Sequence, residues 1–279
     1  VNNDGVISLN EQSVSVVDNA NRLPINYDVN YVSYSFGANY LLNENQSVFA
    51  RHSRGGRANA DRLLFGPSIL PSGAALNGLS ADMVTQTEAG FKHRKGNLGL
   101  YATFFIAYAS EQNWDFAGSA PREIQREYQA KGVELETTYK WNKFDFSGSV
   151  TWTDAQIKRD ALDPSVEGNT PRRQADFIYT LIPSYTYNKF ATGISIIGTT
   201  KSYAQDDNQL VLPAYAIVSP YINYNLSKRL TVALNANNLL NSFGFTESEE
   251  GSIINNQTNI IRARSITGRT IGGSLTFSF

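Results

Sequence analysis

Residues 268–279 read GRTIGGSLTFSF, and this stretch decides how the rest of the sequence is interpreted. From Ile271 to Phe279 the odd positions are apolar or glycine, and the even positions are glycine, serine or threonine. This period of two predicts a β-strand with one apolar face and one small polar face. The stretch ends on Phe279, and aromatic residues are typical of strands that end at a membrane interface. A terminal strand of a soluble β-protein would show the same alternation, so its recurrence upstream decides between the two.

The alternation recurs upstream in pairs of long segments. The predicted strands are 31–42, 46–54, 83–94, 98–110, 126–140, 144–157, 174–187, 190–203, 212–226, 229–241 and 262–279. Tight turns at 43–45, 95–97, 141–143, 188–189 and 227–228 alternate with connections of about 8–28 residues. Strands of this length are longer than the usual ~5–6 residues, and alternating short and long connections are typical of membrane barrels. We therefore predict an all-β fold, a transmembrane antiparallel β-barrel with about 11 strands here, over a soluble β-sandwich.

Composition excludes several classes of protein. The 279 residues carry a formal net charge of −1, which gives no electrostatic attraction to nucleic acid. There is no cysteine, so a disulfide framework or a thiolate metal site is excluded. The sequence contains no run of about 18 apolar residues, so no transmembrane helix is predicted. A mean hydropathy of −0.31 is compatible with a barrel, because half of each strand faces a polar lumen.

Two regions are expected along the chain. Residues 1–29 are polar and rich in turn residues, and counting back from the last strand makes them an extracellular loop region. Residues 30–279 form the barrel portion. No signal peptide opens the chain, so we expect a piece of a longer exported protein.

Several segments together resemble the C-terminal half of the barrel of TonB-dependent outer-membrane receptors. They are TEAGFK at 87–92, GVELE at 132–136, LPAY at 212–215 followed by Val218, NANNLLN at 235–241, and GR at 268–269 with the closing TFSF. Each motif is weak alone, but their order and spacing agree over residues 30–279. Two departures are the missing N-terminal plug domain with its TonB box, and Ser219 before Pro220 where the family often has aspartate.

The resemblance implies that these strands are the last half of a 22-stranded barrel in the outer membrane of a Gram-negative bacterium. It implies energised uptake of a scarce small-molecule ligand, a ferric siderophore first, with haem, cobalamin or oligosaccharide as alternatives. The implied partners are a TonB-type energising protein acting through the plug, the barrel assembly machinery, and outer-membrane lipid with lipopolysaccharide. Phe277 and Phe279 would form the C-terminal assembly signal. A passive diffusion porin has the same strand signature, and an outer-membrane enzyme is the third alternative.

No catalytic constellation is visible, and we expect neither an enzyme nor a bound metal or cofactor. His52 and His93 are interpreted as polar residues near the lumen or outer rim, in preference to a metal or haem site. Glu134 and Glu136 share one face of a predicted strand. Neighbouring basic lumen residues explain these two carboxylates better than acid–base catalysis does.

Basic residues at the start of the first long connection, and aromatic residues in or beside later connections, are the candidate ligand contacts. They are Arg51, Arg54, Arg57, Arg62, Trp114, Phe116 and Tyr203. Guanidinium groups bind carboxylates, catecholates and phosphates through forked hydrogen bonds, and aromatic rings stack on ligands. The alternatives are contact with anionic lipopolysaccharide or plain solvation for the arginines, and a place in the interface girdle for the aromatic residues.

Overall fold

The computed structural model describes residues 28–59, 81–115, 122–248 and 262–279. The expected extracellular region 1–29 lies almost wholly outside the described residues, so its placement stays a prediction. Within these ranges no helix is long and apolar enough to span a membrane, which has no bearing on crossing by strands.

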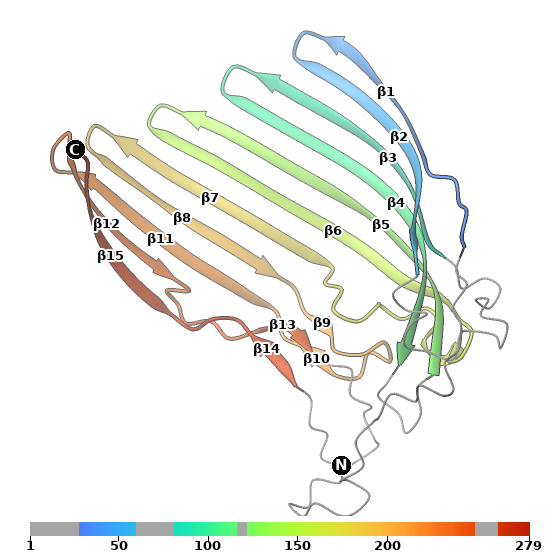
Figure 1. The fold of residues 1–279 in the computed structure, drawn as a ribbon. Coiled ribbons are helices and arrows are strands. Elements are labelled where there is room, and N and C mark those ends of the chain that lie inside the picture. Colours follow the sequence, from blue (N-terminus) through green and yellow to red (C-terminus); the bar gives the residue numbers. More distant parts are fainter. Residues whose placement is uncertain (1–27, 60–80, 116–121, 249–261) are drawn as a thin grey trace, which may run out of the picture.

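The described residues form one curved antiparallel sheet of 11 strands (Figure 1). Its strands, in spatial order, are β1 (Tyr34–Asn43), β2 (Gln46–Ala58), β3 (Ala81–Lys95), β4 (Leu98–Asp115), β5 (Arg122–Trp141), β6 (Phe144–Asp160), β7 (Phe177–Tyr187), β8 (Phe190–Thr199), β11 (Tyr215–Asn225), β12 (Leu230–Asn237) and β15 (Thr270–Phe277). Two small sheets pair β9 (Ser202–Tyr203) with β10 (Val211–Leu212) and β13 (Phe245–Ser248) with β14 (Ala263–Ser265). The predicted antiparallel barrel wall of eleven strands is confirmed.

Residues that tolerate a left-handed backbone form the tight turns. Gly96 (φ 55°), Asn142 (φ 56°) and Asn188 (φ 53°) lie in the turns after β3, β5 and β7. Asparagine and glycine are the residues that adopt this conformation at low cost. The tight turns lie together at one end of the sheet, beside the C-terminus (Figure 1). The long connections therefore leave from the opposite end.

Three expected strands are divided: 190–203 forms β8 and β9, 212–226 forms β11 and part of β10, and 262–279 forms β14 and β15. Residues 262–279 were predicted as a single strand, but they form β14 and β15 with an irregular link between them. Asn238 is fully buried, and its side-chain amide donates to the carbonyl oxygens of Ser242 and Thr267 at 2.9 Å each. The backbone N–H of Arg269 donates to the side chain of Asn241 at 3.0 Å. These local bonds replace ladder bonds and interrupt the strand.

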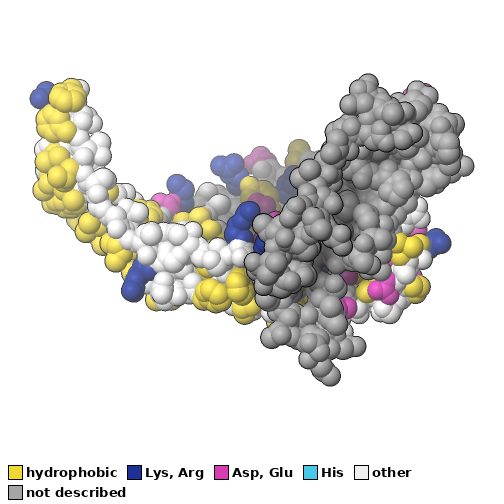
Figure 2. Space-filling model, turned by 60° about the horizontal axis from the view of Figure 1, so that its bottom comes forward, with side chains coloured by type: hydrophobic (Ala, Val, Ile, Leu, Met, Phe, Trp, Pro, Cys, Tyr) yellow, Lys and Arg dark blue, Asp and Glu magenta, His cyan; other side chains and the backbone are white. Residues whose placement is uncertain are grey.

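The strand register gives the sheet one continuous apolar face. Tyr40 lies opposite Val48, which lies opposite Phe91 in the next strand. Farther along, Leu135 pairs with Val150 and Leu234 with Ile222, and directly paired residues share a face. Many of these side chains are exposed, including Leu234 at 55%. Hydrophobic side chains gather on the convex side in Figure 2, which we call the convex face. No second sheet covers it among the residues that the structure describes, which is the arrangement expected for contact with lipid.

The apolar part of the wall matches the thickness of a bilayer. In β6 the convex positions are apolar from Phe144 to Trp152, nine of the strand's 17 residues. A barrel strand needs about 9–11 residues to cross the hydrocarbon. Beyond Trp152 the next convex position is Asp154, which pairs with Lys131 of β5 at 3.1 Å. The strands therefore continue past the apolar band toward the long loops.

Aromatic rings cover glycines of neighbouring strands at several points on the wall. A β-carbon on Gly132 would lie 2.5 Å from the ring of Phe105, and one on Gly193 would lie 2.6 Å from the ring of Tyr221. Because these glycines lack side chains, the rings of the neighbouring strands can approach the backbone closely at these points.

Candidate functional site

A folded loop covers the concave face beyond the apolar band. Residues 161–176 contain a 3-10 helix, Pro164–Val166, and turn back onto β6, where Ile157 is fully buried. The backbone N–H of Ile157 donates to Asn169 O at 2.9 Å, and Gly168 N–H donates to Ile157 O at 2.8 Å. We call residues 161–176 together with residues 204–210 the loop shelf. It lies against the wall at the loop end.

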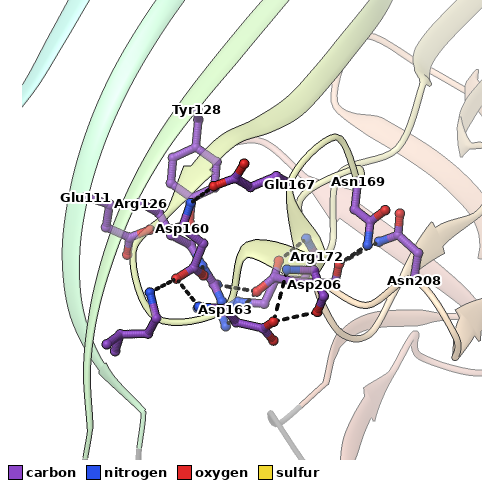
Figure 3. Close-up of polar contacts among 12 residues, drawn as sticks. Glu111, Arg126, Tyr128, Asp160, Asp163, Glu167, Asn169, Arg172, Asp206 and Asn208 are labelled. Carbon is purple, nitrogen blue, oxygen red and sulfur yellow. Dashed lines mark hydrogen bonds and ion pairs between the residues drawn. The ribbon is translucent and has the colours of Figure 1, made fainter.

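An ion network ties the shelf to the wall (Figure 3). Arg126 of β5 donates through Nε to Asp160 Oδ2 at 2.5 Å, and through Nη1 to Asp206 Oδ2. Asp206 also accepts from the backbone N–H of Arg172 at 2.9 Å and lies 3.4 Å from its guanidinium Nη1. The side chains of Arg126, Asp160 and Asp206 are 9%, 1% and 8% exposed. One buried arginine therefore joins two strands and two loops.

Asp160 also organises the start of the shelf. Its Oδ1 accepts from the backbone N–H groups of Leu162 at 2.9 Å and Asp163 at 3.0 Å. Burial alone would raise the pKa of Asp160, but the hydrogen bond from Arg126 and these two backbone donors outweigh it and lower the pKa. Arg126 lies outside the apolar band, and its two carboxylate partners raise the pKa of its guanidinium despite burial. Asp160 and Arg126 are therefore both charged at neutral pH.

Neutral contacts complete the shelf. Asn208 has a left-handed backbone, with φ 58°. Its side-chain amide accepts from Thr170 N–H at 3.0 Å and donates to Thr170 O at 2.7 Å, the two bonds that a neighbouring strand would make. Asn169 donates to Asp206 O at 2.9 Å. On the wall beside them, the hydroxyl of Tyr128 donates to Glu111 at 2.9 Å, and burial followed by the charge of Glu111 raises the pKa of this phenol. The shelf is thus a hydrogen-bonded unit.

The predicted arginine cluster is distributed over both faces. Arg51 lies on the concave face and pairs with Glu88 at 2.9 Å. Arg57 shares that face six residues farther along β2, whereas Arg54 lies on the convex face opposite Tyr34. Arg62 lies outside the described residues. Of the described members, Arg51 and Arg57 therefore share the concave face and Arg54 does not.

The predicted aromatic contacts fall in different regions. Tyr203 is half-buried in β9, its carbonyl accepts from Arg173 N–H at 2.7 Å, and Lys201 Nζ lies 5.6 Å from its ring. The backbone of Trp114 extends β4 opposite Glu123, and Phe116 lies outside the described residues. The ligand-contact role of these residues, like that of the arginines, stays a prediction.

The histidines differ from expectation. His52 lies opposite Phe36 and His93 opposite Leu100, so both share the convex apolar face instead of the lumen. Six positions of β2 and β3 separate them, which excludes a shared metal site. No group of potential metal ligands occurs within the described ranges. The lumen interpretation was wrong: the register places both residues on the apolar face, and His52 already shared the even positions of Val48 and Ala50 in the sequence.

The concave wall itself is polar. Glu136, Ser149 and Thr180 lie opposite one another on three strands, together with Tyr101. They line a shallow cavity of about 300 Å³ in the turn-side half of the wall. Such hydroxyl and carboxylate groups suit polar contacts with water, a ligand or a folded domain inside the barrel.

The closing aromatic residues lie at the turn end. Phe277 and Phe279 are in edge-to-face contact with ring centroids 5.2 Å apart, and both are exposed. Trp141 and Phe144 stack at 6.0 Å, with Tyr185 4.7 Å beyond Phe144. The arrangement is that of an aromatic girdle, and the assembly role of Phe277 and Phe279 stays a prediction.

Sequence reasoning missed the ion network. The predicted strands include Arg126, whereas Asp160, Arg172 and Asp206 fall in the connections between them. Arg126 and Asp206 are 80 residues apart in the chain, so no local spacing links them. The one available signal was that charges of opposite sign flank neighbouring strands at their loop ends.

Known proteins support the architecture. The family described as "TonB dependent receptor-like, beta-barrel" matches residues 10–239. Among solved structures, the ferric yersiniabactin uptake receptor FyuA from Yersinia pestis aligns at 16% identity and TM-score 0.70 over 88% of this chain and 37% of its own. The siderophore receptor PiuA from Acinetobacter baumannii aligns at 18% identity and TM-score 0.69, over 88% of this chain and 36% of its own. The copper transporter OprC aligns at 14% identity and TM-score 0.66, over 88% of this chain and 38% of its own.

These likenesses at low identity show the shared fold. The chain spans less than two fifths of the length of these solved structures. The family match covers most of the chain, including every strand from β1 to β12. The chain belongs to the TonB-dependent receptor-like β-barrel family.

Proposed function

We propose that this chain forms part of the wall of an outer-membrane receptor that takes up a scarce ligand with energy from a TonB-type partner. The observation that carries the proposal is a barrel wall of this family with an apolar convex face and a polar concave face. In lipid, strands satisfy their backbone groups only through closed pairing, so the described strands would pair with further strands of the whole receptor. A plug domain would transmit the energy, and the barrel assembly machinery would insert the protein.

The first ligand class is a ferric siderophore. Two of the aligned structures are named for siderophore or ferric-siderophore uptake. The concave face of this chain carries Arg51 and Arg57 at the loop end, where an anionic chelate would enter. The loop shelf would form a fixed part of the entrance. The family consists of transporters, and we propose no enzymatic activity.

Carbohydrate uptake is a second candidate, favoured by the hydroxyl-lined cavity. Thr138, Ser147, Ser149 and Thr180 present groups that pair with sugar hydroxyls as readily as with a plug domain. A passive porin would have a similar wall but would not need an energy source.

The test is uptake by cells that carry the whole receptor. Cells grown under iron limitation would be given ⁵⁵Fe-labelled siderophores, with labelled oligosaccharides in parallel, in strains with and without the TonB system. We expect saturable accumulation of iron that disappears without TonB. Accumulation of oligosaccharide alone would favour the second candidate, and uptake that persists without TonB would refute energised transport.

A further inference from the structure

Basic side chains gather at the turn end of the wall. The short turns and the residues next to them carry seven lysine and arginine residues but only two acidic ones. The basic residues are Arg94, Lys95, Lys140, Lys143, Lys189, Lys228 and Arg229, and the acidic ones are Glu44 and Asp145. These turns lie together at one end of the sheet (Figure 1). Since the whole chain has a net charge of −1, its positive charge is concentrated at this end.

Part of this charge is already compensated. Lys140 pairs with Asp145 at 3.3 Å, and the two residues lie opposite each other on the concave face. Lys189 donates to the carbonyl oxygen of Leu226, in the next short turn, at 3.3 Å. This contact holds the side chain of Lys189 along the turns but leaves its charge in place. The turns therefore keep a positive charge once their own ion pair is subtracted.

Each of the four hairpins from β3 to β12 has at its turn one lysine that forms no ion pair within the described part of the chain, and we call these residues the turn lysines. They are Lys95, Lys143, Lys189 and Lys228. By the strand register, Lys95 lies opposite Leu98 on the convex face. The ammonium of Lys143 lies 3.3 Å from the centroid of the Tyr187 ring, and Tyr187 is also on the convex face, opposite Phe190. Lys95 and Lys143 are thus directed to the lipid side.

The turn lysines border the apolar band. Phe144, the first apolar residue on the convex side of β6, directly follows Lys143 and stacks on Trp141 with ring centroids 6.0 Å apart. Aromatic residues of membrane proteins lie at the level of the lipid headgroups. A lysine beside them lays its alkyl chain along the apolar surface and extends its ammonium into the polar layer. Their positions therefore place Lys95 and Lys143 at the depth of lipid phosphates.

We propose that the turn lysines bind the headgroups of anionic phospholipids in the leaflet that borders the short turns. The inference takes from the proposed function only that the wall lies in a membrane, and it does not involve the transported ligand. Anionic lipid attracts lysine side chains near the membrane surface, and an ammonium donates hydrogen bonds to phosphate oxygens. Because Lys143 lies over a ring on the lipid-facing side, a lipid headgroup is the partner that meets it there.

The first test compares two double variants in the same two hairpins. Lys95→Gln with Lys143→Gln removes two turn lysines from the lipid side. Arg94→Gln with Lys140→Gln removes the same charge from concave positions. The purified full receptor, stripped of lipid in detergent, would be titrated with phosphatidylglycerol and, as the reference, with phosphatidylcholine. Native mass spectrometry would count the bound lipid, and the parent receptor should prefer phosphatidylglycerol.

We expect the turn-lysine variant to bind phosphatidylglycerol about tenfold more weakly, with binding of phosphatidylcholine unchanged. The concave variant should change by less than about twofold, because its charges face away from the lipid. Lys95→Arg with Lys143→Arg should keep the parent affinity, since arginine keeps the charge. The proposal would be overturned if the parent showed no preference for phosphatidylglycerol, if both glutamine variants weakened equally, or if the arginine variant lost as much affinity as the glutamine variant.

Two further probes separate a lipid headgroup from other anions. Glycerol 3-phosphate carries a phosphate without acyl chains, and at equal concentration we expect it to leave phosphatidylglycerol binding unchanged. A polyglutamate peptide represents an acidic protein surface, and its binding should not depend on the turn lysines. Competition by glycerol 3-phosphate would mean that the lysines bind free phosphate. Peptide binding that is lost with the turn lysines, while phosphatidylglycerol binding persists, would mean an acidic protein partner, and either result counts against the proposal.

Uptake experiments keep this inference separate from the proposed function. If the turn lysines determine phosphatidylglycerol binding but cells show no energised uptake, the proposed function fails and the lipid site stands. If uptake is energised but the turn-lysine variant binds phosphatidylglycerol like the parent receptor, the inference fails and the receptor function stands.

Discussion

Replacement of Arg126 by methionine should release the loop shelf without unfolding the barrel wall. Methionine keeps the length and packing of the side chain but removes the charge that Asp160 and Asp206 share. Removal of one partner of a buried ion pair costs about 3–5 kcal/mol, because it leaves a buried charge without compensation. Since each 1.36 kcal/mol is a factor of ten, local opening of the shelf should become about 10² to 10⁴ times more frequent.

Hydrogen–deuterium exchange of the full receptor in detergent measures this opening directly. Peptides from 161–176 and 204–212 should lose protection by that factor, whereas peptides from the apolar band of β5 and β6 should not change, because local units open independently of the core. The matched control is Arg159→Met. Its partner Glu127 is the next position on the same strand pair, but the two side chains are 69% and 59% exposed and 3.7 Å apart.

Exposed pairs contribute about 0–1 kcal/mol, so Arg159→Met should change exchange by about fivefold at most. Equal protection in Arg126→Met and the parent receptor would refute the argument that this arginine holds the shelf. Equal losses in both variants would show that burial of the pair is irrelevant to its strength.

Three further predictions concern the wall and the shelf. Leu234→Arg should reduce the folded fraction on unheated SDS gels, since arginine on the lipid face costs about 2–4 kcal/mol. Asn235→Arg, on the concave face, should assemble. An equal loss of folded protein in both variants would show that the faces are assigned wrongly. Gly193→Ala should lower the free energy of unfolding in urea by about 1–3 kcal/mol, because the new methyl group overpacks against the ring of Tyr221. Gly55→Ala should not lower it, since a β-carbon there would have nothing within 4 Å. Indistinguishable urea midpoints of the two variants would contradict this. The pKa of Asp160 is lowered in the folded shelf, so the contribution of this carboxylate to shelf stability should be complete above about pH 4 and be lost as pH falls through the lowered pKa. The loss would be visible as reduced exchange protection in 161–176. Protection that falls as pH rises from about 4 to 7 would contradict this direction.

The sequence predicted the wall well because lipid constrains it on every strand. A residue in the apolar band must be apolar on one face, so alternation such as that of 144–153 survives without help from distant contacts. The tight turns were equally readable, since Asn142 and Asn188 supply the left-handed backbone that they need. Both signals are local in the chain, and their positions agree with the observed hairpins.

The loop end was less predictable because its structure depends on contacts between distant segments. β5 runs over 20 residues, to Arg122, where the sequence indicated a strand only from 126. The sequence indicated one strand over 262–279, yet the side chains of Asn238 and Asn241 bind the link between β14 and β15 from the preceding loop. Beyond the bilayer neither face of a strand has to be apolar, so apolar–polar alternation no longer predicts where strands begin and end.

A β-bulge of one residue in β6 places the side chain that holds the shelf on the concave face. If strict alternation continued past Trp152, the even position of Asp160 would place its carboxylate on the convex face. The register instead shifts between Tyr128–Ile157 and Glu127–Arg159, which leaves Lys158 as the bulged residue and reverses the faces beyond it. Asp160 therefore points to the concave side and meets Arg126, while Arg159 turns outward. A bulge leaves ladder groups unpaired, which hydrocarbon does not tolerate, so the reversal can occur only beyond the apolar band. Its position after Trp152 follows from where the lipid ends, and the ion network and the shelf follow from its position.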